Sequence, residues 1–193
     1  MKTDSQELLQ ERILELEAEN VVLRERIDFL EGVPFLRAGM HGETLISQLV
    51  NGKMTIHSAP HDIVVPDGRK LEVKFSRLNI PMKIFSSKRW SWNHPLGMTR
   101  AKDFDRLLLI GEADPRFCSL YRDPSSPYVI FDVPYSRVAA INQKYNHISI
   151  TTSPTRAGTG KRTLLFREFQ TTIKELERRY GIDRTSRAAL RGS

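Results

Sequence analysis

Apolar residues near the start of the chain recur at alternating steps of four and three, which is the repeat of a coiled-coil helix. β-Branched residues and one asparagine take the a positions of the heptad, and leucines take the d positions. The a positions are Ile13, Asn20 and Ile27, and the d positions are Leu9, Leu16, Leu23 and Leu30. This combination favours a parallel two-stranded coiled coil, whose buried asparagines pair and fix the register. The pattern therefore predicts a dimerisation helix within residues 1–33, ended by Gly32 and Pro34.

The residues beside this seam agree with a parallel homodimer. The interchain g-to-e pairs are attractive and consist of Arg12 with Glu17, Glu19 with Arg24, and Arg26 with Glu31. An alternative stays open, because further apolar residues widen the stripe, so the helix could pack on its own body or join a larger oligomer; these are Leu14, Val21, Val22 and Phe29. A leucine-zipper transcription factor is not favoured, because no long basic helix precedes Leu9.

The rest of the chain predicts a mixed α/β body over residues 34–183. A helix is expected over residues 40–50, where the apolar residues share one side, and a long amphipathic helix over residues 164–180. Strands are expected over residues 61–65, 69–75, 106–110, 129–133 and 148–152. The first two strands are separated by Pro66-Asp67-Gly68, which has the residues of a tight turn. Residues 184–193 are expected to form a basic, disordered tail.

Charge divides the 193 residues in the same way. The formal net charge of +7 combines −5 on residues 1–31 with +12 on the remaining 162 residues. A body this basic favours a polyanionic partner. The chain contains no run of about 18 apolar residues, and its polar N-terminus does not resemble a secretory signal. With Cys118 as the single cysteine, these features favour a cytoplasmic protein.

The predicted hairpin brings two acidic residues together. If the turn is centred on Asp67, Asp62 lies opposite Glu72, with the two side chains about 5 Å apart on one face. Lys74 emerges on the same face, while the intervening apolar residues face the core. Opposed like charges destabilise a sheet. A divalent cation between them would offset that repulsion.

This set of residues suits phosphodiester hydrolysis. Mg²⁺ prefers oxygen ligands and is typically held by one or two carboxylates together with substrate phosphate. A neighbouring lysine can orient the attacking water, and the metal can polarise the phosphate. The alternative for Asp62, Glu72 and Lys74 is an exposed strand face with a cross-strand Glu–Lys pair, which is common on surface sheets.

Asp62 followed by Glu72-Val73-Lys74 resembles the core motif of the PD-(D/E)XK nuclease superfamily, which includes the type II restriction endonucleases. The resemblance implies a restriction-endonuclease-like mixed sheet flanked by helices. It also implies that Asp62 and Glu72 bind Mg²⁺ with the main-chain carbonyl of Val73, and that Lys74 serves the attacking water. Glu43, at an expected helix start after Gly42, is similar to the extra acid that many members carry.

The resemblance extends over roughly residues 36–152 in the order of elements, and it has one departure. Asp62 follows His61, whereas the family motif has proline at that place. The literal Pro66-Asp67 pair lies in the turn, only five residues before Glu72, and Asp67 would project from the hairpin tip. Asp62 is therefore the preferred metal ligand.

Basic and aromatic residues outside the hairpin are candidates for DNA contacts. Residues 88–94 combine bases with aromatics in an apparent loop, in which Lys88 and Arg89 would hold phosphates while Trp90 and Trp92 stack on bases. Alternatively, the two tryptophans anchor a long loop to the body. The remaining candidates are Arg77 and, in a glycine-rich basic loop, Arg156, Lys161 and Arg162.

Two other metal chemistries are not favoured. A zinc site from His57, His61 and Cys118 is weak, because Pro60 breaks any helix between the histidines and the cysteine is isolated. Asn93-His94 is only faintly similar to the HNH nuclease motif.

The sequence therefore predicts a Mg²⁺-dependent endonuclease that cuts double-stranded DNA at a specific palindromic site, as a homodimer and in a prokaryotic or phage context. The alternatives are a homing, repair or junction endonuclease of the same superfamily and, from another class, a dimeric DNA-binding protein without catalysis.

Overall fold

The computed structural model describes residues 2–32, 34–56, 58–78, 88–98, 102–114, 126–151 and 161–180. Within its helices, the side chains of residues 2–8, 11, 25–26, 28–37 and 161–164 are not described. The chain consists of two compact units, Met1–Arg37 and Ala38–Ser193. The predicted tail at 184–193 lies outside the described residues. No helix in the described ranges is long and apolar enough to span a membrane.

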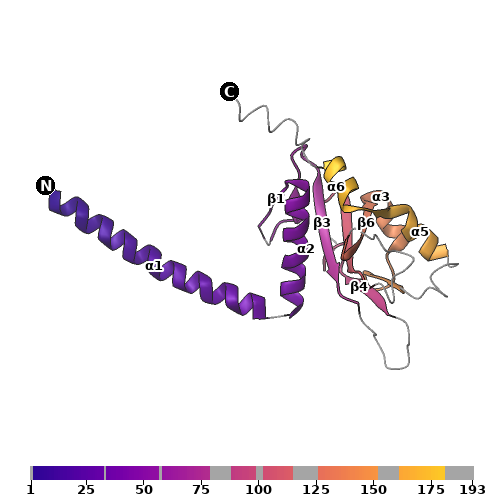
Figure 1. Cartoon of the computed structure of the whole chain (residues 1–193), viewed down its shortest axis with the longest axis horizontal. Helices are drawn as coiled ribbons and strands as arrows, with labels where there is room; N and C mark the ends of the chain where they lie inside the picture. Colours follow the sequence, from indigo (N-terminus) through magenta and orange to yellow (C-terminus); the bar gives the residue numbers. More distant parts are fainter. Residues whose placement is uncertain are drawn as a thin grey trace. The chain divides into compact units, whose positions relative to one another are not determined.

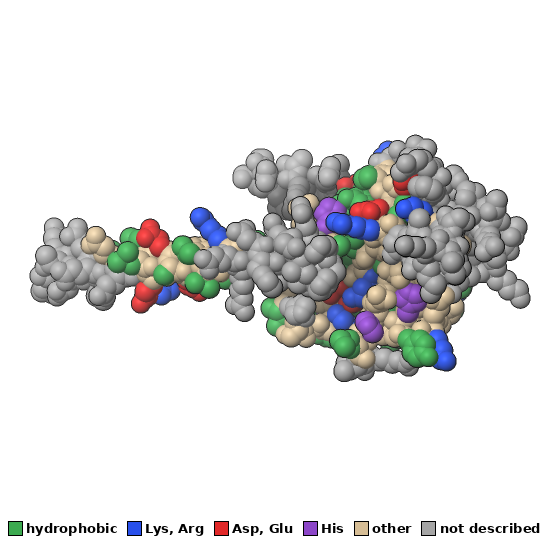
Figure 2. Space-filling model, turned by 90° about the horizontal axis from the view of Figure 1, so that it is seen from below, with side chains coloured by type: hydrophobic (Ala, Val, Ile, Leu, Met, Phe, Trp, Pro, Cys, Tyr) green, Lys and Arg blue, Asp and Glu red, His purple; other side chains and the backbone are tan. Residues whose placement is uncertain are grey.

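The first unit is the helix α1 (Lys2–Gly32), which ends at the predicted glycine. Its described a and d side chains are 41–64% exposed for Leu9, Ile13, Leu16, Leu23 and Ile27. Figure 2 shows hydrophobic side chains interleaved with charged ones along α1. The Asn20 side-chain amide donates to the carbonyl of Leu16 at 2.9 Å. The helix is confirmed, whereas the coiled-coil partner stays a prediction.

The second unit is a mixed α/β body built on a mixed sheet of order β1-β2-β3-β5-β6-β8. Only β3 and β5 pair in parallel, and every other neighbouring pair is antiparallel. These strands are β1 (Lys53–Met54), β2 (Ile63–Val64), β3 (Lys70–Ser76), β5 (Arg106–Glu112), β6 (Tyr128–Pro134) and β8 (Gln170–Thr171). A separate antiparallel pair consists of β4 (Arg89–Asn93) and β7 (His147–Thr151).

Both faces of the sheet are covered (Figure 1). On one face lie α2 (Pro34–Val50) and α6 (Ile173–Tyr180), and on the other lie α3 (Tyr135–Ile141), α5 (Lys161–Phe169) and the β4–β7 pair. Strand β5 is buried on both sides, since Leu108 and Ile110 belong to one apolar cluster and Leu107 and Leu109 to the other. A strand buried on both faces reads as a continuous apolar run rather than as an alternating one.

The single helix predicted over residues 164–180 is wrong. Helix α5 ends at Phe169, and Gln170 and Thr171 pair with β6 at the edge of the sheet before α6 begins. Thr172 and Glu175 exchange hydrogen bonds, with the Thr172 N–H donating to Glu175 Oε2 at 2.9 Å and the Glu175 N–H donating to Thr172 Oγ1 at 3.2 Å. This is a capping box, which starts a new helix at this point.

Other boundaries also differ from the prediction. Helix α2 begins at Pro34 rather than at residue 40, so Glu43 lies in the interior of a helix and not at its start. Strand β2 contains only Ile63 and Val64, and Asp62 lies just before it. Residues 89–93, predicted as part of a loop, form β4.

Candidate active site

The hairpin register places Asp62 beside Glu72, as predicted. Ile63 pairs with Leu71, and the Asp62 N–H donates to the Leu71 carbonyl at 3.0 Å. The ladder between the two strands ends here, and Asp62 Oδ2 accepts the N–H of Val73 at 2.8 Å. The carboxylate therefore takes the place of the next ladder partner, which fixes its orientation and leaves Oδ1 for a cation.

The same strand edge presents a main-chain oxygen. In an extended strand the N–H and C=O of one residue point to the same side. Because the Val73 N–H points to Asp62, the Val73 carbonyl lies on that edge as well. The oxygen that the resemblance assigns to the metal is therefore on the correct side of β3.

Glu72 is fully buried, at 0% exposed, between β2 and β5. Among the described residues, its two carboxylate oxygens are contacted by lysine ammonium groups rather than by backbone N–H groups. The Lys74 ammonium lies 2.6 Å from Oε1 and the Lys102 ammonium lies 3.0 Å from Oε2. Glu72 therefore does not lie on an exposed strand face, as the alternative required, although it does form an ion pair with Lys74.

Lys102 is a site residue that the sequence prediction missed. It reaches the acids from the segment before β5, and its ammonium is also 3.5 Å from Asp62 Oδ1. The following residues hold its backbone, since the Asp103 N–H donates to Pro60 at 3.0 Å and the Asp105 N–H donates to Lys70 at 2.9 Å. No local motif marks Lys102, because its position depends on the parallel pairing of β5 with β3.

Glu43 approaches the cluster from α2. Burial, and then the negative charge of Asp62, raises the pKa of Glu43 to about 7, while the Lys74 charge acts in the opposite direction. Among the described residues, no three His, Cys, Asp or Glu side chains converge to hold a metal ion. Glu43 is thus coupled electrostatically to the site, and the two carboxylates of Asp62 and Glu72 are the acidic ligands available.

Burial also raises the pKa of Glu72, with a further contribution from Asp62, against the lowering effect of the nearby ammonium groups. Burial alone disfavours the charged form of Lys102, but its contacts with Glu72 and Asp62 outweigh this, so the pKa of Lys102 is raised. The acids and lysines therefore depend on one another for their charged states.

Glu43→Gln is expected to stabilise the metal-free protein at pH 8 and to leave its stability nearly unchanged at pH 4. A folded-state pKa above the unfolded value of 4.5 means that stability falls as pH rises from 4.5 through 7, and glutamine removes that loss. The full shift corresponds to about 3 kcal/mol, and solvent screening at this half-buried site reduces the expected gain to about 1–2 kcal/mol. Urea unfolding in EDTA at both pH values measures it.

The control is Glu168→Gln, which neutralises an exposed glutamate paired with Arg137. It is expected to change stability by less than about 0.5 kcal/mol at either pH. An equal gain from Glu43→Gln at pH 4 and pH 8 would show that Glu43 titrates normally.

The predicted stacking of Trp90 and Trp92 on DNA needs correction. Their side chains are 0% and 1% exposed, and their indole N–H groups donate to the carbonyls of Glu112 and Ile110, each at 3.0 Å. They are buried because β4 packs against the sheet, and alternate residues of a strand share one face. The alternative that they anchor this segment to the body is therefore supported, although the segment is strand β4 and not a loop.

The other DNA-binding candidates have mixed outcomes. Arg77 is exposed, 3.6 Å from Glu112 Oε1. Lys88 and Arg89 are partly buried at the start of β4. Lys161 and Arg162 belong to helix α5, but their side chains, like all of Arg156, lie outside the described residues.

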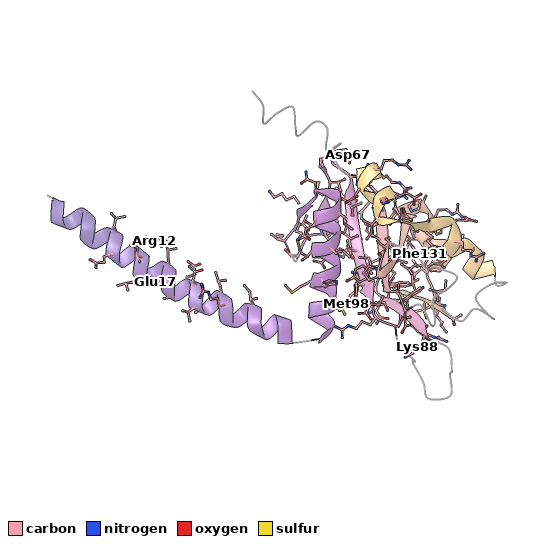
Figure 3. All side chains as sticks on the ribbon, in the orientation of Figure 1. Arg12, Glu17, Asp67, Lys88, Met98 and Phe131 are labelled. Atoms are coloured by element: carbon pink, nitrogen blue, oxygen red, sulfur yellow. The ribbon has the colours of Figure 1, made fainter. Side chains whose placement is uncertain are left out.

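The rejected metal candidates can also be placed. Asp67 lies in the turn and accepts hydrogen bonds from Arg69, including one from Arg69 Nε at 2.7 Å. Figure 3 shows Asp67 at the hairpin tip and Lys88 at the opposite end of the body. His57 and Cys118, named for zinc, lie outside the described residues.

No protein-family model matches the chain, and no curated protein is significantly similar to it. Any functional assignment therefore rests on the geometry and chemistry of the site itself.

Proposed function

We propose that this chain is a Mg²⁺-dependent endonuclease that hydrolyses phosphodiester bonds in double-stranded DNA. Its body would be a variant of the restriction-endonuclease-like fold, with Asp62, Glu72 and Lys74 as the catalytic residues. Glu43 would orient the site from α2. Supporting features are a mixed sheet flanked by helices and an acid pair at the end of a hairpin.

The observation that carries the proposal is the burial of Glu72 beside Asp62, with Lys74 at 2.6 Å. A buried cluster of one carboxylate and two ammonium groups contributes little to stability, because the desolvation of the charges offsets their attraction. A buried acid whose pKa is shifted by desolvation and by neighbouring charges is typical of functional sites. The acid pair is therefore better explained by chemistry than by stability.

The donor set fits Mg²⁺. Asp62 Oδ1, the Glu72 carboxylate and the Val73 carbonyl are hard oxygen ligands on one strand edge, and two carboxylates are typical for this ion. When bound there, Mg²⁺ would polarise the phosphate and offset the negative charge that develops on the leaving oxygen.

The chain's own residues supply the remaining steps. Lys74 is partly exposed, so a water molecule can reach its ammonium group, which orients the water and stabilises the hydroxide formed when that water gives a proton to solvent. The water oxygen forms a bond to phosphorus, the phosphorus–oxygen bond to the leaving nucleotide breaks, and the leaving oxygen takes up a proton from solvent. The ammonium of Lys74 also attracts the anionic phosphate.

The exposed apolar stripe of α1 supports a parallel homodimer. Two sites related by a two-fold axis would match a palindromic duplex, with one strand cut by each subunit. The functional assay combines the purified chain with mixed duplex DNA and Mg²⁺, followed by sequencing of the ends. Cleavage at a fixed sequence is expected, whereas DNA binding without any cutting would favour a non-catalytic DNA-binding protein.

Asn20→Leu is expected to change the oligomeric state from a dimer to a mixture that includes trimers or tetramers. A leucine at this a position removes the buried asparagine pair that restricts register and oligomer number. Sedimentation equilibrium measures the mass, with Asn142→Leu in the body as a control for the substitution itself. A monomer before and after the change would refute the coiled coil.

A further inference from the structure

We propose that Lys102 is an internal counter-ion that occupies the cation position between Asp62 and Glu72 and competes with the divalent metal for these two carboxylates. The inference rests on the proposed function, because it concerns the same acid pair. It adds a control on metal binding that the catalytic assignment alone does not contain.

The contacts distinguish Lys102 from Lys74. Within the described residues, the Lys74 ammonium is ion-paired with Glu72 alone, at Oε1. The Lys102 ammonium bridges the two acids, 3.0 Å from Glu72 Oε2 and 3.5 Å from Asp62 Oδ1. These are the oxygens that would face a metal, since Asp62 Oδ2 is already bound to the Val73 N–H. An ammonium group and Mg²⁺ cannot share this position, because both are cations that need the same oxygens.

A cavity beside Lys102 could hold its side chain after displacement by a metal ion. It lines a cavity of about 500 Å³ together with Asp103, Asp105 and Tyr135. Asp103 and Asp105 are exposed and can attract a displaced ammonium group. A lysine side chain on its four-carbon stem can therefore move from the buried acids to the cavity without losing all of its negative partners.

The backbone around Lys102 does not need to move. The hydrogen bonds of Asp103 to Pro60 and of Asp105 to Lys70 fix the chain just after it. Gly97 lets the stem of Lys102 pass closely, because a Cβ at that position would lie 2.9 Å from Lys102 Cγ. Only the side chain has to rearrange, so the two states differ in one ammonium position.

Competition of this kind lowers the affinity for metal. Without metal, Lys102 offsets the repulsion between the two acids and stabilises the fold. When metal binds, the interaction of Lys102 with the two acids is lost. The net free energy of metal binding is therefore smaller than the metal–ligand contacts alone would provide. Removal of the ammonium group should therefore strengthen metal binding while weakening the metal-free fold.

The test is calorimetric titration of the full chain with Mn²⁺ in the absence of DNA. Lys102→Met is expected to bind Mn²⁺ about tenfold more tightly than the wild type, within the usual range of coupling between two sites. Lys144→Met is the matched control, because Lys144 is exposed and its ammonium group lies over the ring of Tyr145 rather than against the acid pair or Asp103. Its affinity should equal that of the wild type. Asp62→Asn should abolish binding in both backgrounds, which places the ion at this site.

If Lys102→Met does not fold without metal, Lys102→Gln provides a polar neutral side chain that can still donate to a carboxylate, and it should also bind Mn²⁺ more tightly. Equal or weaker binding by the neutral variants, with binding by the wild type intact, overturns the role of Lys102 and leaves the metal site standing. Absence of Mn²⁺ binding in every variant overturns both proposals. Tighter binding without DNA cleavage supports Lys102 as the competitor and argues against the nuclease.

Discussion

Asp62→Asn and Lys74→Met are each expected to abolish cleavage of duplex DNA, with rates about 10²- to 10⁴-fold lower, while DNA binding is kept. Asparagine retains a carbonyl oxygen that can accept the Val73 N–H, so the hairpin should stay intact while the anionic ligand is lost. Methionine keeps the length and packing of Lys74 and removes its charge. The two variants therefore delete different parts of the same reaction.

The two variants are expected to differ in Mn²⁺ binding. Asp62→Asn is expected to lose Mn²⁺ binding, whereas Lys74→Met should keep it, because Lys74 is not a ligand. Initial rates of cleavage with Mg²⁺ measure activity, gel-shift assays with Ca²⁺ measure DNA binding, and calorimetric titration measures Mn²⁺ binding, with Lys144→Met again as the control. Cutting at the wild-type rate by both variants would exclude this acid pair as the active site.

The hairpin was predictable because its signals are local. A Pro-Asp-Gly turn fixes the centre, and the period of two then assigns every opposed pair. The observed pairing of Ile63 with Leu71 confirms this register. The burial of Glu72 was not predictable from the hairpin alone, because it depends on β5 and on the β4–β7 pair, which come from distant parts of the chain.

The predictions of a loop at residues 88–94 and of one helix at residues 164–180 were wrong although the sequence contains local signals for the observed elements. Arg89-Trp90-Ser91-Trp92-Asn93 alternates apolar and polar residues, which is the pattern of a half-buried strand, although its composition also suits a DNA-binding loop. Thr172 and Glu175 have the spacing of a capping box inside what was predicted as one helix. Lys102 had no local signal, because only the tertiary fold brings it to the acids.

Gly111→Ala is expected to destabilise the body by about 3 kcal/mol, because it overfills a tightly packed contact. A Cβ at residue 111 would lie 2.5 Å from Cε2 and Nε1 of Trp90. The indole cannot retreat easily, since it is fully buried, packs against Phe131 at a centroid distance of 6.1 Å and donates to the carbonyl of Glu112. Urea unfolding monitored by tryptophan fluorescence and circular dichroism measures the loss.

Gly39→Ala is the matched control, because its Cβ would meet no atom within 4 Å and an alanine in helix α2 should stabilise by about 0.5–1 kcal/mol. Trp90→Leu in the Gly111→Ala background should recover part of the lost stability, since the smaller side chain makes room for the new methyl group. If Gly111→Ala unfolded like the wild type, Trp90 would not lie against this strand, and its indole would again be a candidate for stacking on DNA. The same substitution thus tests the core and the placement of the tryptophans away from the DNA.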